Sequence, residues 1–209
     1  DLLGNAFVCE PVHNLVHRQV LVPNGITFDG RRAAGEEESE FVASTDHWFR
    51  PVYTVTGPDG CLWIVDMHRY VIEHPEWIPE DWEKVLDLRA GDDRGRIYRV
   101  TPKDSPAGPL PRLDSTSPRE WLRMLSSPNG WIRDTAQQQL AWLEESPPAD
   151  WLVEEWTNRA TPLGRIHILG LLEKGGVPSN LLFEAMTAPA PELQRFALRL
   201  TGGINLNPA

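Results

Sequence analysis

The stretch RPVYTVTGPDGCLWIVD, residues 50–66, is typical of a β-hairpin. Two apolar runs flank a short segment that is rich in turn formers. Pro58 and the pair Asp59-Gly60 supply the backbone angles that a tight turn needs. A further run, GRIYRV at residues 95–100, has the composition of a third strand. We therefore expect a small antiparallel sheet in this part of the chain.

A long segment, residues 67–94, separates the hairpin from the expected third strand. Loops longer than about 12–15 residues in a compact domain are usually functional or disordered. This segment is rich in His, Trp, Glu and Arg, and its aromatic residues argue against disorder. The insertion, as we call residues 67–94, is therefore where functional residues are expected.

The composition is that of a folded, acidic protein. Of the 209 residues, 41% are hydrophobic, and the formal net charge is −10. This charge argues against nucleic acid or an anionic membrane as the main partner. No run approaches the roughly 18 apolar residues of a membrane-spanning helix, so we expect no transmembrane segment in this stretch. The cysteines, Cys9 and Cys61, form no Cys-x-x-Cys-His motif, so no haem is expected to attach within this stretch.

The composition divides the chain into three parts. Residues 1–100 contain short apolar runs separated by Gly and Pro, which indicates an all-β architecture. Residues 101–118 are rich in proline and are expected to form a linker. In residues 119–209 the apolar spacing becomes helical.

The β part contains a weak internal repeat. Residues 4–10 parallel residues 60–66, and residues 14–17 parallel residues 96–99. Each unit is a strand that ends in an acid, then a connection, then another strand, and such repetition is typical of β-propellers. We predict part of a β-propeller, about one and a half blades, where a complete propeller has at least about four. The chain is therefore expected to be a fragment.

The helical part also repeats. Arginines occur near the start of alternate predicted helices, at positions 133, 165 and 195. Leucines of the preceding stretches recur at positions 122, 152 and 182. Helix pairs with this period indicate a solenoid of HEAT-like repeats. For the arginines we prefer a structural ladder to a binding strip.

Several motifs together resemble a known group of proteins. They are STDHWFRPV (44–52), GPDG (57–60), VDMHRYVIEHPEWIP (65–79) and DDRGRIYRV (92–100). In these motifs the chain is similar to the large planctomycete-type membrane-bound dehydrogenase proteins. The run IEHPEWIP within the insertion is the most selective of them.

The resemblance implies a propeller similar to that of the PQQ-dependent soluble glucose and sorbosone dehydrogenases, followed by HEAT-like repeats. It implies a periplasmic or secreted location and a c-type haem domain downstream in the parent protein. The catalytic and cofactor residues of those dehydrogenases come from several blades. The resemblance therefore assigns no individual residue of this chain a role.

Propeller geometry predicts which residues share a rim. The segment that enters the first strand of a blade and the loop after the second strand lie on one face. Residues 46–50 are therefore expected beside the insertion, at the mouth of a central channel. Such a mouth is a normal place for a small-molecule site.

Quinone-dependent oxidation of a sugar or an alcohol would use the residue types found here. His74 would take the hydroxyl proton as base. Arg50 and Arg69 would bind the carboxylates of PQQ, and Trp48 would stack on its rings. Each has a structural alternative: Arg50 could pair with a neighbouring Asp, and His74 could hydrogen-bond the backbone and lock its loop.

Carboxylates in the same region are candidate metal ligands. Asp66 and Glu73 could hold a calcium ion through their oxygens or orient other groups. Alternatively, Asp66 could cap a turn at the end of its strand. Trp77 and Trp82 are expected to seal the insertion onto the blade rather than to stack on a cofactor.

Three classes of function remain open. The favoured hypothesis is a fragment of a PQQ-dependent sugar or alcohol dehydrogenase, inactive in isolation because the channel cannot close. The alternative is a non-catalytic propeller and HEAT module that binds glycan or protein. A hydrolase or lyase that uses the same rim is the third. A downstream Cys-x-x-Cys-His would favour electron transfer.

Overall fold

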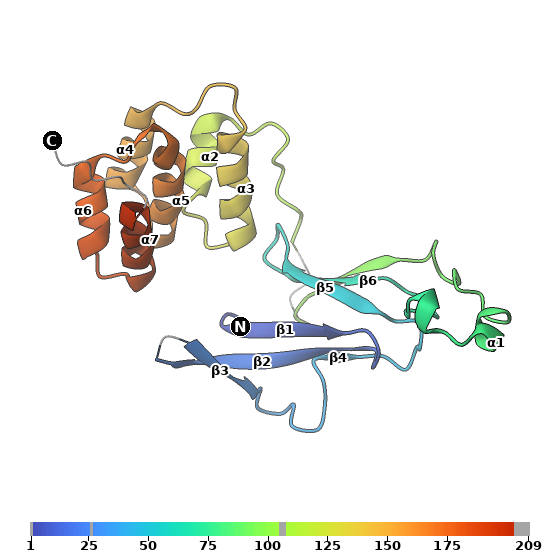
Figure 1. The fold of residues 1–209 in the computed structure, drawn as a ribbon. Helices are drawn as coiled ribbons and strands as arrows, with labels where there is room; N and C mark the ends of the chain where they lie inside the picture. Colours follow the sequence, from blue (N-terminus) through green and yellow to red (C-terminus); the bar gives the residue numbers. More distant parts are fainter. Residues whose placement is uncertain (1, 26, 105–107, 203–209) are drawn as a thin grey trace. The chain divides into compact units, whose positions relative to one another are not determined.

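The computed structural model describes residues 2–25, 27–104 and 108–202. Antiparallel sheets in the N-terminal part are followed by helices (Figure 1). The chain divides into two compact units. The sheet unit comprises Asp1–Gly57 and Cys61–Ala107, and the helical unit comprises Pro58–Gly60 and Gly108–Ala209. The predicted order, β structure and then helices, is confirmed at this coarse level.

The first sheet has four strands in the described residues. They are β1 (Asn5–Glu10), β2 (Leu15–Asn24), β3 (Thr27–Arg32) and β4 (Val42–Ala43). Strands β1, β2 and β3 follow one another in antiparallel order, and β4 also pairs with β2. Asn14 turns the chain from β1 into β2 with a positive φ of 59°. Its side chain donates to the carbonyl of Phe49 at 2.6 Å, which fixes the segment before the second sheet.

The second sheet confirms the predicted hairpin and third strand. Its antiparallel strands are β5 (Pro51–Thr56), β6 (Leu62–Asp66) and β7 (Arg96–Val100), in that order. The N–H of Gly57 donates to the carbonyl of Cys61 at 2.8 Å and closes the hairpin. Gly60 has a φ of +79°, a conformation in which glycine carries no steric cost.

The two faces of the second sheet differ. Ile64 is buried on one face, where the register places it between Thr54 and Tyr98. This face meets the first sheet, because β5 lies next to β1 and Thr54 hydrogen-bonds Cys9. On the opposite face, Tyr53 and Ile97 are exposed. The second sheet therefore has one covered face and one apolar face in solvent.

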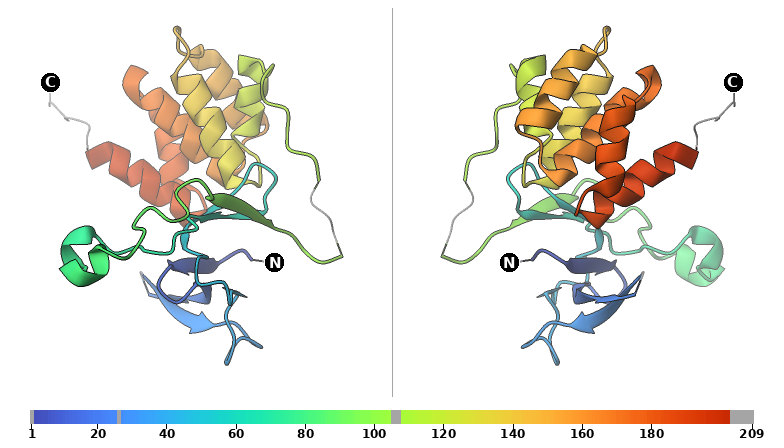
Figure 2. Two further views of the ribbon diagram at one scale, coloured as in Figure 1. Left: turned by 90° about the vertical axis from the view of Figure 1, so that its right-hand side faces the viewer. Right: turned by 90° about the vertical axis from the view of Figure 1, so that its left-hand side faces the viewer.

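The insertion leaves the second sheet at the end of β6. It contains a 3₁₀ turn, η1 (Pro75–Trp77), and a single helical turn, α1 (Glu80–Glu83). Figure 2 shows this segment projecting away from the strands. Its base is closed where the guanidinium of Arg69 donates to the carbonyls of Leu88 and Arg89 at 3.2 and 3.1 Å. The insertion is thus a closed loop on a narrow base.

The helical unit is built from α2 to α7 and a short 3₁₀ turn. Their bounds are α2 (Pro118–Met124), α3 (Gly130–Ala141), α4 (Ala149–Asn158), α5 (Pro162–Leu172), η2 (Glu173–Gly175), α6 (Ser179–Thr187) and α7 (Pro191–Gly202). Local signals start three of these helices: Ser117 forms a capping box with Glu120, and the side chains of Asn129 and Thr161 accept from backbone N–H groups. Pro118 and Pro162 occupy first-turn positions that need no donor.

Helix α5 is central to the helical unit. It packs against α3, α4 and α7, and its residues Ile168 and Leu169 are fully buried. Arg165 of α5 pairs with Glu184 at 2.9 Å and lies over the ring of Trp156. This contact agrees with the structural interpretation of the repeated arginines. None of the helices in the described residues is long and apolar enough to cross a membrane.

Candidate functional site

Asp66 organises the end of strand β6. Its carboxylate is fully buried. Oδ1 accepts from the backbone N–H of Arg50 at 2.7 Å and from that of His68 at 2.8 Å. Oδ2 lies 3.5 Å from the hydroxyl of Tyr98. The carboxylate therefore ties the entry of β5 to the exit of β6, as its turn-capping interpretation predicts.

The Arg50 side chain connects the turn after β1 to the first residues of the insertion. Its Nη1 donates to the carbonyl of Pro11 at 2.7 Å, in the turn after β1. Its Nε and Nη2 donate to the carbonyls of Arg69 and Tyr70 at 3.0 and 3.1 Å. No ion pair of Arg50 occurs in the part of the chain that the structure describes, so the alternative of an Arg50–Asp pair was wrong. Main-chain carbonyl oxygens accept the hydrogen bonds of this guanidinium instead.

His68 lies buried at the base of the insertion. Its backbone has a positive φ of 50°, unusual for a residue with a side chain. The indole of Trp48 packs against the imidazole with ring centroids 5.7 Å apart, and against the ring of Tyr70 at the same distance. Gly91 lies close to the His68 backbone, because a Cβ there would be 2.2 Å from the carbonyl oxygen of His68 and 3.3 Å from the indole of Trp48.

Contacts of the His68 ring define its neutral tautomer. Nε2 lies 3.2 Å from Nη2 of Arg96, which can only donate. Nε2 is therefore the acceptor, and Nδ1 carries the proton. Nδ1 faces Oδ2 of Asp66 at 3.6 Å. This separation is longer than a hydrogen bond, and Nδ1 has no hydrogen-bond partner among the described residues.

Arg96 is a member of this cluster that sequence reasoning did not single out. The register of the second sheet pairs it directly with Asp66 across β6 and β7. A hydrogen bond with Tyr98 raises the pKa of Arg96 above its ordinary value, and the charge of Asp66 acts in the same direction. Pairing the ends of the two predicted strands that flank the insertion would have revealed the Asp66–Arg96 pair.

Two predicted site residues lie out on the insertion. The side chain of His74 is 71% exposed, and its Nδ1 accepts from the N–H of Glu76 at 3.3 Å, which caps η1. Glu73 is exposed and accepts from the N–H of Ile72 at 3.4 Å. These contacts are local. Among the described residues, the contacts around Asp66 bring together Trp48, Arg50 and Arg69 but neither of these two.

The expected sealing role of two tryptophans was wrong. Trp77 is 77% exposed and Trp82 is 63% exposed. Both belong to the short turns η1 and α1, which bury no residue. These turns are too short to cover a ring of this size, so the indoles lie in solvent.

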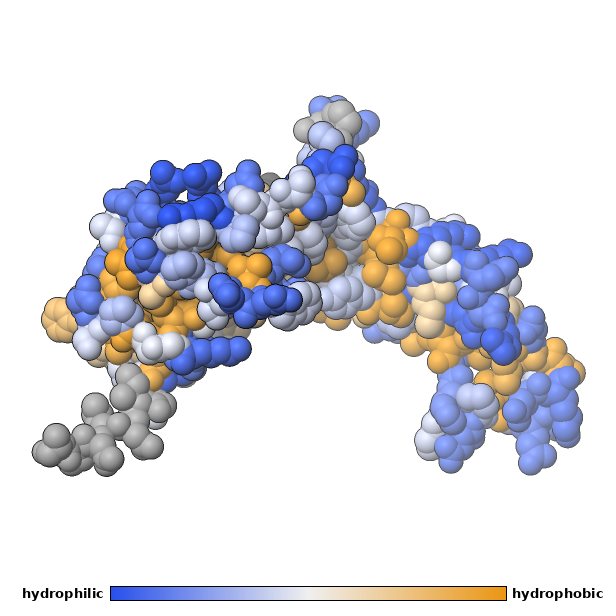
Figure 3. Space-filling model, turned by 90° about the horizontal axis from the view of Figure 1, so that it is seen from above, coloured by the Kyte–Doolittle hydropathy of each residue, from blue (hydrophilic) through white to orange (hydrophobic). Residues whose placement is uncertain are grey.

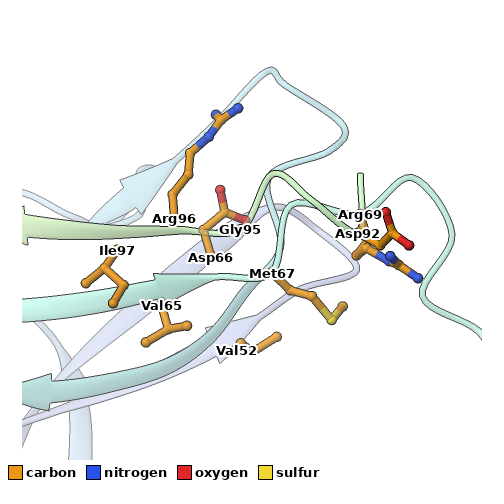
Figure 4. Close-up of a pocket in the computed structure, with 9 residues that line it drawn as sticks. All are labelled: Val52, Val65, Asp66, Met67, Arg69, Asp92, Gly95, Arg96 and Ile97. Carbon is orange, nitrogen blue, oxygen red and sulfur yellow. The ribbon is translucent and has the colours of Figure 1, made fainter. Parts of the chain in front are cut away.

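A hollow of about 640 Å³ lies on the open face of the second sheet. Val52, Val65 and Ile97 point into it, while the side chains of Asp66 and Arg96 point to the opposite side of the sheet (Figure 4). Arg69 and Asp92 lie at one end of the hollow. The hollow is therefore apolar, and the polar cluster does not open into it.

The residues present do not by themselves fit a calcium or a quinone site. Oδ1 of Asp66 is already engaged by two N–H groups. No group of three or more His, Cys, Asp or Glu side chains suited to a metal ion occurs within residues 2–25, 27–104 and 108–202. The guanidinium groups of Arg50 and Arg69 bind carbonyl oxygens. These side chains form hydrogen bonds with the protein's own backbone rather than with a ligand.

Comparison with known families gave a match that includes the residues of this site. Residues 1–104 match the model of the family Domain of unknown function (DUF7133). The DUF7133 match covers both sheets, the Arg50–Asp66 contact and the whole insertion, and it ends before α2. Neither the curated proteins nor the solved structures yielded a match.

Proposed function

We propose that the chain is part of a PQQ-dependent dehydrogenase that oxidises a sugar or an alcohol and is periplasmic or secreted. The observation that carries the proposal is the Arg50 contact set. It joins the turn after β1 to the start of the insertion and so keeps Trp48, His68 and Tyr70 at one end of the sheet unit. Motif resemblance supports the same assignment.

Within this proposal the sheets belong to a β-propeller and the helices to a HEAT-like solenoid. Two features of the sheet unit support a propeller. Consecutive strands are neighbours from β1 to β3 and from β5 to β7, as in the blades of such folds, while β4 pairs with β2. The open face of the second sheet carries Tyr53, Val65 and Ile97, which a further sheet would cover.

The surroundings of His68 make it a better candidate base than His74. A base must present a nitrogen without a proton to the substrate hydroxyl. That nitrogen is engaged in both residues: Nε2 of His68 accepts from Arg96 at 3.2 Å, and Nδ1 of His74 accepts from the N–H of Glu76 at 3.3 Å. His68 differs in having the buried carboxylate of Asp66 on the other side of its ring and the indole of Trp48 against it. We therefore assign proton acceptance to His68, with the substrate hydroxyl replacing Arg96 at Nε2 and Arg96 then beside the alkoxide that forms.

Because Arg50, Arg69 and Asp66 are engaged internally, PQQ and calcium would be held by residues other than these. The role of Arg50 and Asp66 is then to position the His68 segment. This assignment differs from the sequence-based one, in which the same residues bound cofactor and metal.

The test is an assay of the intact parent protein. It is supplied with PQQ and calcium, and dye reduction is followed with a panel of sugars and alcohols. Turnover that needs both additions supports the proposal. Absence of both quinone binding and turnover rejects it, and binding of a ligand without redox change favours a non-catalytic module.

A further inference from the structure

The tip of the insertion exposes an unusual set of apolar side chains. Trp77, Trp82 and Val85 are all more than 60% exposed and lie within nine residues. Figure 3 shows hydrophobic residues at the surface in the lower right of the view, where the insertion lies, beside hydrophilic ones. Large aromatic side chains in solvent are characteristic of binding surfaces.

The charge around these side chains restricts the chemical class of ligand that could bind there. Residues 70–88 contain six carboxylates and, apart from His74, one basic side chain, Lys84, which pairs with Asp81 at 3.7 Å. Carboxylates are acceptors only, so they favour ligands with many donors and repel anions. Because the described residues offer no group of three metal-ligating side chains, a metal ion is not the ligand indicated.

We propose that the tip of the insertion binds a neutral saccharide chain. The indole faces of Trp77 and Trp82 would pack on the apolar faces of sugar rings, and Glu76, Glu80 and Glu83 would accept from their hydroxyls. The tip is too small for a stable protein partner, since such interfaces use about 20–30 residues a side. A saccharide needs only a few aromatic and polar groups.

This inference does not depend on dehydrogenase activity, because binding is measured without turnover. The 209-residue chain is titrated with maltohexaose, cellohexaose, xylohexaose and mannohexaose by calorimetry, with tryptophan emission as a second readout. Variants W77A and W82A are compared with W142A, whose indole is 69% exposed in the helical unit. Circular dichroism verifies the fold of each variant.

We expect at least one saccharide to bind, with an affinity that is the same at low and high salt because the ligand is neutral. W77A and W82A each weaken that affinity by about tenfold or more, a loss of roughly 1.4 kcal/mol, and W142A changes it by less than about twofold. The inference is overturned if no saccharide binds, if W77A and W82A bind like the natural chain, or if salt abolishes binding, which would indicate a cationic ligand.

Discussion

The carboxylate of Asp66 accepts a hydrogen bond from the backbone N–H of Arg50 at 2.7 Å, and the same oxygen accepts from the N–H of His68. One buried side chain thereby satisfies the backbone at the entry to one strand and at the exit of its neighbour. The geometry of the whole cluster rests on this contact, because Arg50 and His68 each carry further partners.

Replacing Asp66 by Ala leaves two backbone donors without a partner in a buried region. We expect D66A to lower the free energy of unfolding of the sheet unit by about 2–5 kcal/mol. Urea titration read by hydrogen exchange of sheet-unit peptides measures this loss. D93A is the control: its side chain is 82% exposed, and it should change stability by less than about 0.5 kcal/mol.

Replacing Arg50 by Lys tests whether the fork geometry matters rather than the charge. An ammonium group cannot reach the carbonyls of Pro11, Arg69 and Tyr70 together. R50K should cost about 1–3 kcal/mol and should speed amide exchange around residues 11–12 and 69–70. If both segments of R50K exchange their amide hydrogens as slowly as in the natural chain, Arg50 does not connect them. R94K, on an exposed arginine, serves as the control.

Gly91 should tolerate no side chain. Its φ is +91°, and a Cβ would lie 2.2 Å from the carbonyl oxygen of His68. G91A should destabilise the sheet unit by about 1–3 kcal/mol or more. G95A provides the comparison, because a Cβ there meets its nearest atom at 3.6 Å, an ordinary contact. Equal unfolding midpoints for the two variants would show that the close approach is absent.

The two histidines make opposite predictions for catalysis in the parent protein. If His68 is the base, H68Q should lower kcat by about 100-fold or more. H74Q should leave kcat within about twofold, since that imidazole caps an exposed turn. A pH profile of kcat separates a proton-accepting His68 from a merely structural one. Only if His68 accepts the proton does H68Q remove the fall of kcat at acidic pH. The reverse ranking of the two variants would restore His74 as the base.

His167 makes the helical unit sensitive to acid. Burial lowers the pKa of His167 below its ordinary value of about 6.5. The charge of Arg133 acts in the same direction, and that of Asp134 opposes it. Between the two pKa values the unfolded chain binds a proton that the folded chain does not, so stability falls as pH drops below about 6.5.

This acid sensitivity can be measured as the difference in unfolding midpoint between pH 7 and pH 5 for the natural chain and H167Q. We expect a smaller difference in H167Q, which can keep the polar contact that His167 makes with Gln137 at 2.5 Å. An unchanged difference would assign the acid sensitivity to other groups.

Local features of the sequence predicted much of the fold. Gly60 and its neighbours marked the turn of the hairpin, and the apolar runs beside it and at residues 95–100 marked β5, β6 and β7. The structure adds capping side chains of the same local kind at Ser117 and Asn129, which the sequence analysis did not single out. These signals act within a few residues, so they are legible without the tertiary structure.

The candidate site was predicted less completely. Trp48, Arg50, Asp66 and Arg69 do lie together, but as side chains that hold the backbone. The residue types are the same for holding a backbone carbonyl and for holding a ligand carboxylate. Only the partner distinguishes the two, and the partner Pro11 is 39 residues away from Arg50.

The sequence by itself determined the order of β structure and then helices, the hairpin with its third strand, and that a long acidic and aromatic insertion interrupts the second sheet. Only the tertiary structure decided that Asp66 and His68 are buried while His74, Trp77 and Trp82 are exposed. The physical reason is that burial depends on which distant segments of the chain pack on a side chain. The residues next to it in the sequence do not predict those segments.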